Sequence, residues 1–327
     1  MRFALKLPGM TLYPGRGKHW WEHITAEQML EIAQRTDALG YDYLELPSHF
    51  VMNRESAAEM GPRWTHSLVA AGFVAAATKR IRVMPLLVVP YHDPIEVAKA
   101  LATADYLSGG RVTPLLLVGY KEWEFDLLNV AFADRGPIMT EYIEAMIELW
   151  ESDEPVFHGK WVNFDDVVFD PKPIQRPMPL MFGGHSKAAL RRAARFGSGW
   201  YSAMVTRAEF PALVEFLRAQ PGFQERPRPL EISLPTFEGV RDKVSHKVHK
   251  QPKIEHERDA ILEALGEIAA LGATMTDAND YMGIGKYQND QPTAPAPVRD
   301  AAEYLDRLEW FAAEILPAAR SIQPPPA

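Results

Sequence analysis

The stretch TAEQMLEIAQRTDALGYDYLELP, Thr25 to Pro47, joins a helix to a strand through a single glycine. Thr25, with Gln28 three residues later, forms the capping-box pattern that marks a helix start. Gly40 is a natural helix stop, because glycine readily adopts the left-handed conformation found at helix ends. The run from Tyr41 to Pro47 is rich in the aromatic and aliphatic residues typical of a strand. This stretch therefore predicts one helix–strand unit of a parallel sheet.

The same alternation of strand-type and amphipathic helical segments continues along most of the 327 residues. It predicts a single α/β domain over residues 1–327, a (β/α)8 TIM-like barrel with insertions. A doubly wound sheet with a second domain is the alternative, but no linker rich in Pro, Gly or Ser divides the chain. The expected strands lie near residues 2–7, 41–47, 81–90, 112–119, 179–184, 199–204, 230–239 and 273–279.

Two segments do not follow the alternation. Residues 151–178 are proline-rich and lack a helical period, so we expect an irregular, hairpin-like excursion there. Residues 241–258 are rich in Lys, Arg, His and Glu, which is typical of a solvated loop. The Gly-Gly corner in LSGGR, Leu107 to Arg111, suits a helix end that turns into a strand, and we interpret it as structural.

Composition excludes several classes of function. A formal net charge of −8 argues against a broad nucleic-acid surface, because duplex binding depends on many lysines and arginines. The absence of cysteine excludes disulfides, thiolate metal sites and cysteine nucleophiles. No apolar run is long enough for a membrane span or a signal peptide. We therefore expect a soluble, cytoplasmic protein.

In a barrel the chemistry lies where strands end, so polar groups at those positions are the candidate site residues. His49 follows one strand, and histidine can exchange a proton near neutral pH. Tyr120 and Glu124 follow another strand, where they are expected to shape a pocket and orient a polar group. Aromatic side chains and one histidine in the loops are candidates for a substrate pocket: Trp20, Trp64, His66 and Trp161.

The turn in MFGGHSKAALRRAARFGSGW, Met181 to Trp200, is either a tight connection or an anion site. Gly183 and Gly184 allow close backbone approach, and Ser186 is a good N-cap. The first helical turn contains Lys187 and two alanines but no acidic residue, although the helix dipole favours negative charge there. A bound phosphate would supply that charge.

Other chemistries lack their signatures. The ten histidines show no HExxH or His-x-His spacing, so no metal site is expected. No GxSxG elbow is present. A glycoside hydrolase is disfavoured, because we expect no pair of carboxylates at the strand ends.

The segments that carry these features, in this order, resemble the luciferase-like monooxygenase superfamily. The matching stretches are AQRTDALGYDYLELPSH, TKRIRVMPLLVVPYHDPIEVAKALATADYLSGGRV, AFADRGPIMTEYIEAMIELW and PKPIQRPMPLMFGGHSKAALRRAARFGSGWY. The resemblance covers roughly residues 1–205. It implies a TIM-like barrel that binds FMN or the deazaflavin coenzyme F420 at its C-terminal end.

The resemblance also assigns roles to residues. It implies that His49 lies beside the cofactor ring, preceded by Ser48 where F420 enzymes often have aspartate. Tyr120 and Glu124 fall in the segment after the fourth strand, and Leu86–Leu87 is the bond near which the family often has a non-prolyl cis peptide that supports the ring. The residues that match the phosphate-binding turn are Gly183, Gly184, His185 and Ser186.

The F420 branch is the closer resemblance, and it implies hydride transfer between F420 and a small organic substrate. The first alternative is a monooxygenase that uses reduced FMN from a partner flavin reductase and oxygenates an apolar or aromatic substrate. The second alternative is a non-catalytic flavin-binding protein. A homodimer is expected from the family, and neither nucleic acid nor a membrane is expected as a partner.

Overall fold

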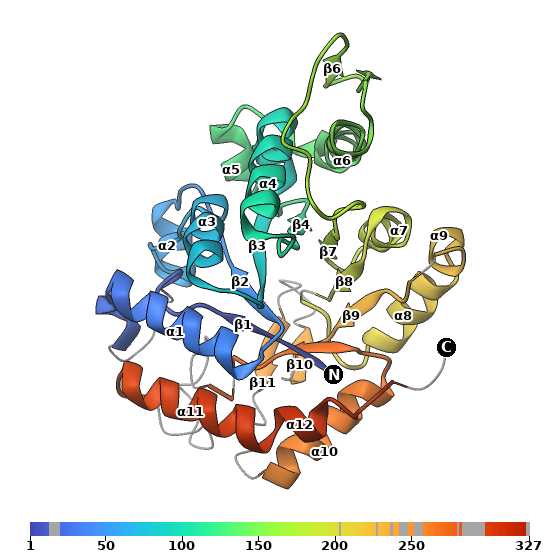
Figure 1. The fold of residues 1–327 in the computed structure, drawn as a ribbon. Helices are drawn as coiled ribbons and strands as arrows, with labels where there is room; N and C mark the ends of the chain where they lie inside the picture. The colour runs from blue at the N-terminus through green and yellow to red at the C-terminus, as the bar shows by residue number, and fades with distance from the viewer. Residues whose placement is uncertain are drawn as a thin grey trace.

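A computed structural model of the chain describes residues 1–12, 20–202, 204–226, 228–235, 238–241, 248–251, 258–279, 281–282 and 298–324. Within these ranges, eight parallel strands close into a barrel that helices surround (Figure 1), which confirms the predicted (β/α)8 fold. The barrel strands are β1 (Arg2–Lys6), β2 (Tyr43–Leu46), β3 (Arg82–Val88), β4 (Leu115–Leu117), β7 (Met181–Gly183), β8 (Gly199–Tyr201), β9 (Glu231–Ser233) and β12 (Met275–Asp277).

Helices follow each barrel strand along the chain and pack outside the barrel. The α-helices are α1 (Ala26–Leu39), α2 (Arg54–Met60), α3 (Ser67–Ala77), α4 (Pro94–Ser108), α5 (Glu122–Leu127), α6 (Arg135–Glu151), α7 (Lys187–Phe196), α8 (Phe210–Arg218), α9 (Pro221–Gln224), α10 (Arg258–Ala270), α11 (Ala301–Glu314) and α12 (Leu316–Ala319). Three short 3-10 helices are η1 (Trp20–His23), η2 (Val89–Tyr91) and η3 (Phe132–Asp134).

The barrel closes through β1, which pairs with β2 on one side and with β12 on the other. Ala4 lies opposite Tyr43 in the first pairing and opposite Asp277 in the second. All neighbouring pairs are parallel, so the carboxyl ends of all eight strands lie at one end. We call this end the mouth.

Side chains alternate between the barrel interior and the layer under the helices, as strand geometry requires. A small cluster fills the interior, formed by Ala4, Tyr43, Met84, Leu115, Met181 and Met275. A larger cluster lies between strands and helices and includes Phe3, Leu44, Phe182 and Trp200. Every second side chain along a strand faces the barrel interior. The inward-facing residue nearest the carboxyl end of each strand therefore lies closest to the mouth.

Local sequence signals set the helix ends as expected. Thr25 and Gln28 form the reciprocal capping box, and Gly40 takes the left-handed conformation at the end of α1. Asp93 caps α4 ahead of Pro94, and Gly109 ends that helix in the left-handed conformation. These contacts satisfy backbone groups that a helix end leaves unpaired.

The two irregular segments each contain a short hairpin. β5 (Phe157–His158) pairs with β6 (Asn163–Phe164), and this hairpin lies outside the ring of helices beyond α6 (Figure 1). β10 (Glu238–Arg241) pairs with β11 (Val248–Gln251), so part of the expected charged loop is a two-stranded sheet. The rest of that loop, 242–247 and 252–257, lies outside the described residues.

In the part of the chain that the structure describes, every helix is too short or too polar to cross a membrane.

Candidate functional site

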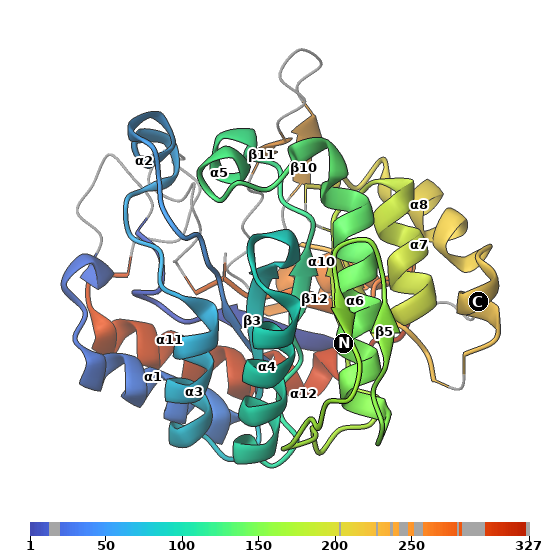
Figure 2. The ribbon, with the colours of Figure 1, turned by 90° about the horizontal axis from the view of Figure 1, so that it is seen from above.

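Several insertions gather at the mouth. Figure 2 shows α2, α5 and the β10–β11 hairpin at the same end of the molecule. These segments follow β2, β4 and β9, so each extends a loop that begins at the carboxyl end of a barrel strand. Active sites of TIM barrels form at this end, from the loops that follow the strands. The candidate site is therefore sought there.

Glu124 is the centre of a buried polar network at the mouth. Its side chain is fully buried, and its Oε2 lies 3.0 Å from Nδ1 of His49. The hydroxyl of Tyr91 donates to the same oxygen at 3.1 Å, and the backbone N–H of Phe50 donates to Oε1 at 3.2 Å. Although the sequence separates them by 75 residues, the structure brings the two predicted residues His49 and Glu124 together.

This network orients the histidine. A carboxylate only accepts hydrogen bonds, so Glu124 favours the His49 tautomer that carries its proton on Nδ1. Nε2 then carries the free lone pair of the ring. Burial and the negative charge of Glu124 raise the pKa of Tyr91 far above its usual value, so Tyr91 stays protonated and remains a donor.

Aromatic rings extend the network on both sides. Trp64 lies edge-on to His49, with ring centroids 4.5 Å apart. Phe50 contacts the rings of His66, Tyr91 and His92 at centroid distances of 5.7, 6.0 and 4.8 Å. The structure thus places the predicted Trp64 and His66 on the two sides of the His49–Phe50 segment.

The sequence patterns did not single out Tyr91 and His92 as candidate site residues. Burial, and to a smaller extent the nearby His66, lowers the pKa of His92 to about 4. Both residues directly follow β3, and the rule that chemistry lies at strand ends applies to them as it does to His49. Their position after a strand end was the sequence feature that could have identified them.

Two other predicted residues, Trp20 and Trp161, lie away from this network, whereas Tyr120 lies at its edge, close enough to Tyr91 to raise the pKa of that hydroxyl. Trp20 packs against Tyr304 of α11, with ring centroids 5.6 Å apart. Trp161 belongs to the outer hairpin, where its backbone N–H donates to Glu141 of α6 at 2.6 Å. Tyr120 is 57% exposed, and its hydroxyl lies 3.5 Å from the sulfur of Met60 in α2. None of these described contacts joins them to Glu124.

Leu86 and Leu87 face opposite sides of β3. Leu86 packs on the interior cluster, whereas Leu87 is buried in the outer core. Among the described residues, cis peptide bonds occur only at Asp170–Pro171 and Arg176–Pro177, so the Leu86–Leu87 bond is trans. Ser48 is half-buried immediately before His49.

The turn from Gly183 to Ser186 connects β7 to α7. Gly184 has φ +116°, a conformation that side-chain-bearing residues rarely adopt. A Cβ on Gly183 would lie 2.2 Å from Cδ2 of Leu117, so a larger residue there requires that leucine side chain to move. Ser186 caps α7 by accepting the N–H of Ala189 at 3.2 Å.

The start of α7 has the properties of an anion site. No acidic residue lies in its first turn, and the residues from His185 to Ala188 are exposed. Four basic residues and no acidic residue lie in the helix itself, KAALRRAARF. Helix N-termini bind phosphate through free backbone N–H groups and the helix dipole. These residues fit the phosphate group of a flavin-type cofactor.

Charged side chains inside the barrel correct one expectation. Glu45 and Asp277 are 4% and 8% exposed, and each lies two residues beyond an interior residue, Tyr43 or Met275. They flank β1, where Lys6 lies opposite Glu45 in the strand register. The expectation that strand ends carry no pair of carboxylates is therefore wrong. The cause is that neighbouring strands bring together residues far apart in sequence.

Within the described residues, no group of three His, Cys, Asp or Glu side chains is placed to hold a metal ion.

Comparison with known proteins identifies relatives of the chain. A family model described as luciferase-like monooxygenase matches residues 2–262. An FMNH2-dependent dimethylsulfone monooxygenase from Pseudomonas putida is 29% identical over 184 residues. That match covers 55% of this chain and 48% of the relative, so the chain spans about half the length of that protein.

Two solved structures share the fold over nearly their whole length. The monooxygenase RslO1 from Streptomyces bottropensis has a TM-score of 0.71 at 18% identity, covering 97% of this chain and 99% of its own. The coenzyme F420 dependent tetrahydromethanopterin reductase from Methanopyrus kandleri has a TM-score of 0.65 at 13% identity, covering 97% and 98%. At these identities the likeness shows the barrel fold alone.

Proposed function

The chain belongs to the luciferase-like monooxygenase family, and we propose that it is an oxidoreductase that transfers a hydride between coenzyme F420 and a small organic substrate. One observation carries the proposal: a histidine oriented by a buried glutamate lies at the mouth of the barrel. The acid-free start of α7 supports it, because a helix start of this kind can hold a cofactor's phosphate.

The proposed roles follow from the geometry. The backbone N–H groups at the start of α7 would hold the phosphate, and Leu86, which packs on the interior cluster, would support the ring. The bound cofactor supplies the hydride chemistry. Glu124 fixes the proton of His49 on Nδ1, and Nε2 of His49 gives or takes the proton that accompanies substrate conversion.

The rings around His49 suit a substrate with an apolar or aromatic part. Trp64 lies edge-on to His49, and His66 contacts Phe50, the residue after it; such aromatic surfaces bind apolar groups well. Trp20 and Trp161 are left out of this pocket, because the contacts described above hold them elsewhere, whereas Tyr120 remains a candidate for its wall because it acts on Tyr91.

A second candidate is an FMNH2-dependent monooxygenase. The similarity to the FMNH2-dependent dimethylsulfone monooxygenase of Pseudomonas putida favours it. In that case a separate flavin reductase would supply the reduced FMN, and the same turn at α7 would bind its phosphate. Both candidates use one barrel and one histidine, so the choice depends on the cofactor.

A titration of the purified protein with F420 and with FMN, each oxidised and reduced, tests the proposal. We expect F420 to bind and His49→Ala to lower turnover about 100-fold with little change in F420 affinity, because proton transfer contributes a factor of that order. Oxygen consumption with reduced FMN, and none with reduced F420, would establish the second candidate. Tight binding without turnover over a broad substrate panel would indicate a non-catalytic binding protein.

A further inference from the structure

Ser202 carries a buried hydroxyl without a partner. The residue is fully buried, and its Oγ makes no hydrogen bond within the described structure. Its backbone is engaged, since its N–H donates to the carbonyl of Ser233 and its own carbonyl accepts the N–H of Val205, each at 3.3 Å. A buried polar group without a hydrogen bond is costly, so such groups are rare in folded proteins.

The strand pairing places Ser202 beside the turn that begins α7. Tyr201, the preceding residue, lies opposite Gly183 in the register, and its carbonyl accepts the N–H of Gly184 at 3.2 Å. The indole N–H of Trp200 donates to the carbonyl of Gly184 at 2.7 Å. Both polar groups of the Gly184 backbone are therefore bound by the two residues that precede Ser202.

Alternation along the strand gives the direction of the side chain. Trp200 packs in the outer core beneath α7 and α8, stacked on Phe210. Ser202 lies two residues closer to the mouth and on the same side. This alternation directs its side chain into the layer between the barrel and α7.

We propose that Ser202 is a further cofactor-binding residue, whose hydroxyl donates a hydrogen bond to the cofactor phosphate at the start of α7. The inference rests on the proposed function, since it assumes that a phosphate-bearing cofactor occupies this turn. It adds a side-chain donor from β8 to the backbone donors of the helix start.

The charge around this position favours an anion as the partner. α7 contains Lys187, Arg191, Arg192 and Arg195 and no acidic residue. Lys187 and Arg191 lie over the ring of Phe216 in α8, at 5.3 and 5.5 Å from its centroid. A phosphate oxygen would satisfy the Ser202 hydroxyl, the helix dipole and these cations together.

The test compares Ser202→Ala with wild type in binding two pairs of compounds: FMN with riboflavin, and F420 with its phosphate-free riboside. Fluorescence titration measures each affinity. For the phosphate-bearing member that wild type binds, we expect about tenfold weaker binding by Ser202→Ala, since a hydrogen bond to a charged group is lost. Affinity for the phosphate-free member should stay unchanged. Ser202→Thr keeps the hydroxyl and should restore most of the affinity.

Ser198→Ala is the matched control on the same segment. Its hydroxyl already donates to the carbonyl of Leu180 at 3.2 Å, at the opposite end of the barrel. We expect this variant to bind both members of each pair like wild type. Thermal unfolding without ligand should show Ser202→Ala at least as stable as wild type, because the variant removes an unpaired hydroxyl.

The outcomes separate this inference from the proposed function. If wild type binds none of these cofactors, the proposed function fails. If wild type binds a phosphate-bearing cofactor and Ser202→Ala binds it equally well, the inference on Ser202 is overturned and the function stands. A loss of equal size for the phosphate-free compound would also overturn it, because the effect would not concern phosphate.

Discussion

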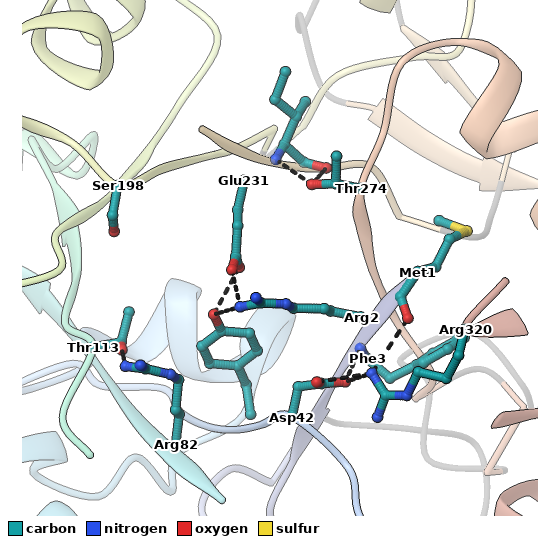
Figure 3. A network of polar contacts seen from close by, with 12 residues as sticks. Met1, Arg2, Phe3, Asp42, Arg82, Thr113, Ser198, Glu231, Thr274 and Arg320 are labelled. Carbon is teal, nitrogen blue, oxygen red and sulfur yellow. Dashed lines mark hydrogen bonds and ion pairs between the residues drawn. The ribbon is translucent and has the colours of Figure 1, made fainter. Parts of the chain in front are cut away.

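The two ends of the barrel use polar side chains in opposite ways. At the end opposite the mouth, charged groups bond to one another: Arg2 forms an ion pair with Glu231, and Tyr43 donates to the same carboxylate at 2.7 Å (Figure 3). At the mouth, Glu124 holds a histidine and Ser202 has no partner among the described residues.

The end opposite the mouth also joins distant parts of the chain. Asp42 accepts the N–H of Phe3 at 2.8 Å and pairs with Arg320 at 2.6 Å (Figure 3). Arg82 donates to Thr113 at 3.0 Å. These contacts connect β1, β2, β3 and the C-terminal segment, so they stabilise the closure of the barrel.

This contrast between the two ends indicates where a ligand binds in such a fold. A polar network in which each described group bonds to another stabilises the chain without need of a ligand. Groups that are held in one orientation or left without a partner are placed for something that binds. In TIM barrels the mouth carries the chemistry and the opposite end carries stability.

Glu124→Gln, a substitution at the mouth, should have the largest effect, on turnover. The amide has the shape of the carboxylate but no negative charge, so it no longer favours the reactive tautomer of His49. We expect turnover to fall about 100-fold, the range typical of a lost acid–base partner. The free energy of unfolding, measured in urea, should change by less than about 1 kcal/mol. A large loss of stability with normal turnover would place Glu124 among the structural groups instead.

Glu231→Ala tests the opposite end. It leaves Arg2 and the hydroxyl of Tyr43 without their shared acceptor, and we expect a loss of about 2 kcal/mol in the free energy of unfolding. Cofactor affinity should be unchanged. Glu309→Ala is the control, since it removes the exposed ion pair with Arg35, for which about 0.5 kcal/mol or less is expected. Weaker cofactor binding by Glu231→Ala would show that the two ends are not separate.

His92 should make the free energy of unfolding depend on pH, and this is the smallest of the expected effects. Its pKa lies at about 4 in the folded protein, below the usual value of about 6.5 that the unfolded chain has. Between these values the unfolded chain binds a proton that the folded protein does not. Stability due to neutral His92 is therefore fully present above pH 6.5 and is lost as the pH falls toward 4.

The measurement is urea unfolding of wild type and His92→Phe at about pH 7.5 and about pH 5.8. The phenylalanine keeps a ring against Phe50 and stays neutral. We expect wild type to lose about 1 kcal/mol more than the variant over this range. Equal losses in the two proteins would mean that His92 is not held neutral by its surroundings.

The sequence predicted the barrel, which the structure confirms, and two parts of the candidate site. Glycine at helix ends, the capping box and the alternation of strands with helices are local patterns, and the structure bears them out. His49 and Glu124 were found because each comes soon after a strand. The turn from Gly183 to Ser186 was found because its acid-free helix start can be seen within a few residues.

Other residues could not be placed from the sequence. Trp20 and Trp161 look like pocket aromatics, yet α11 holds one and α6 the other through contacts between distant segments. Glu45 lies opposite Lys6, and Asp277 opposite Ala4, only because β2 and β12 both pair with β1. Ser202 looks like any serine after a strand until its burial and missing partner are known.

The fold class and the helix caps at Thr25 and Ser186 follow from the sequence alone, because periodicity and caps depend on residues within one or two turns of each other. Which groups meet at the mouth depends on the tertiary structure. His49 and Glu124 are 75 residues apart and come together because parallel strands end side by side once the barrel has closed.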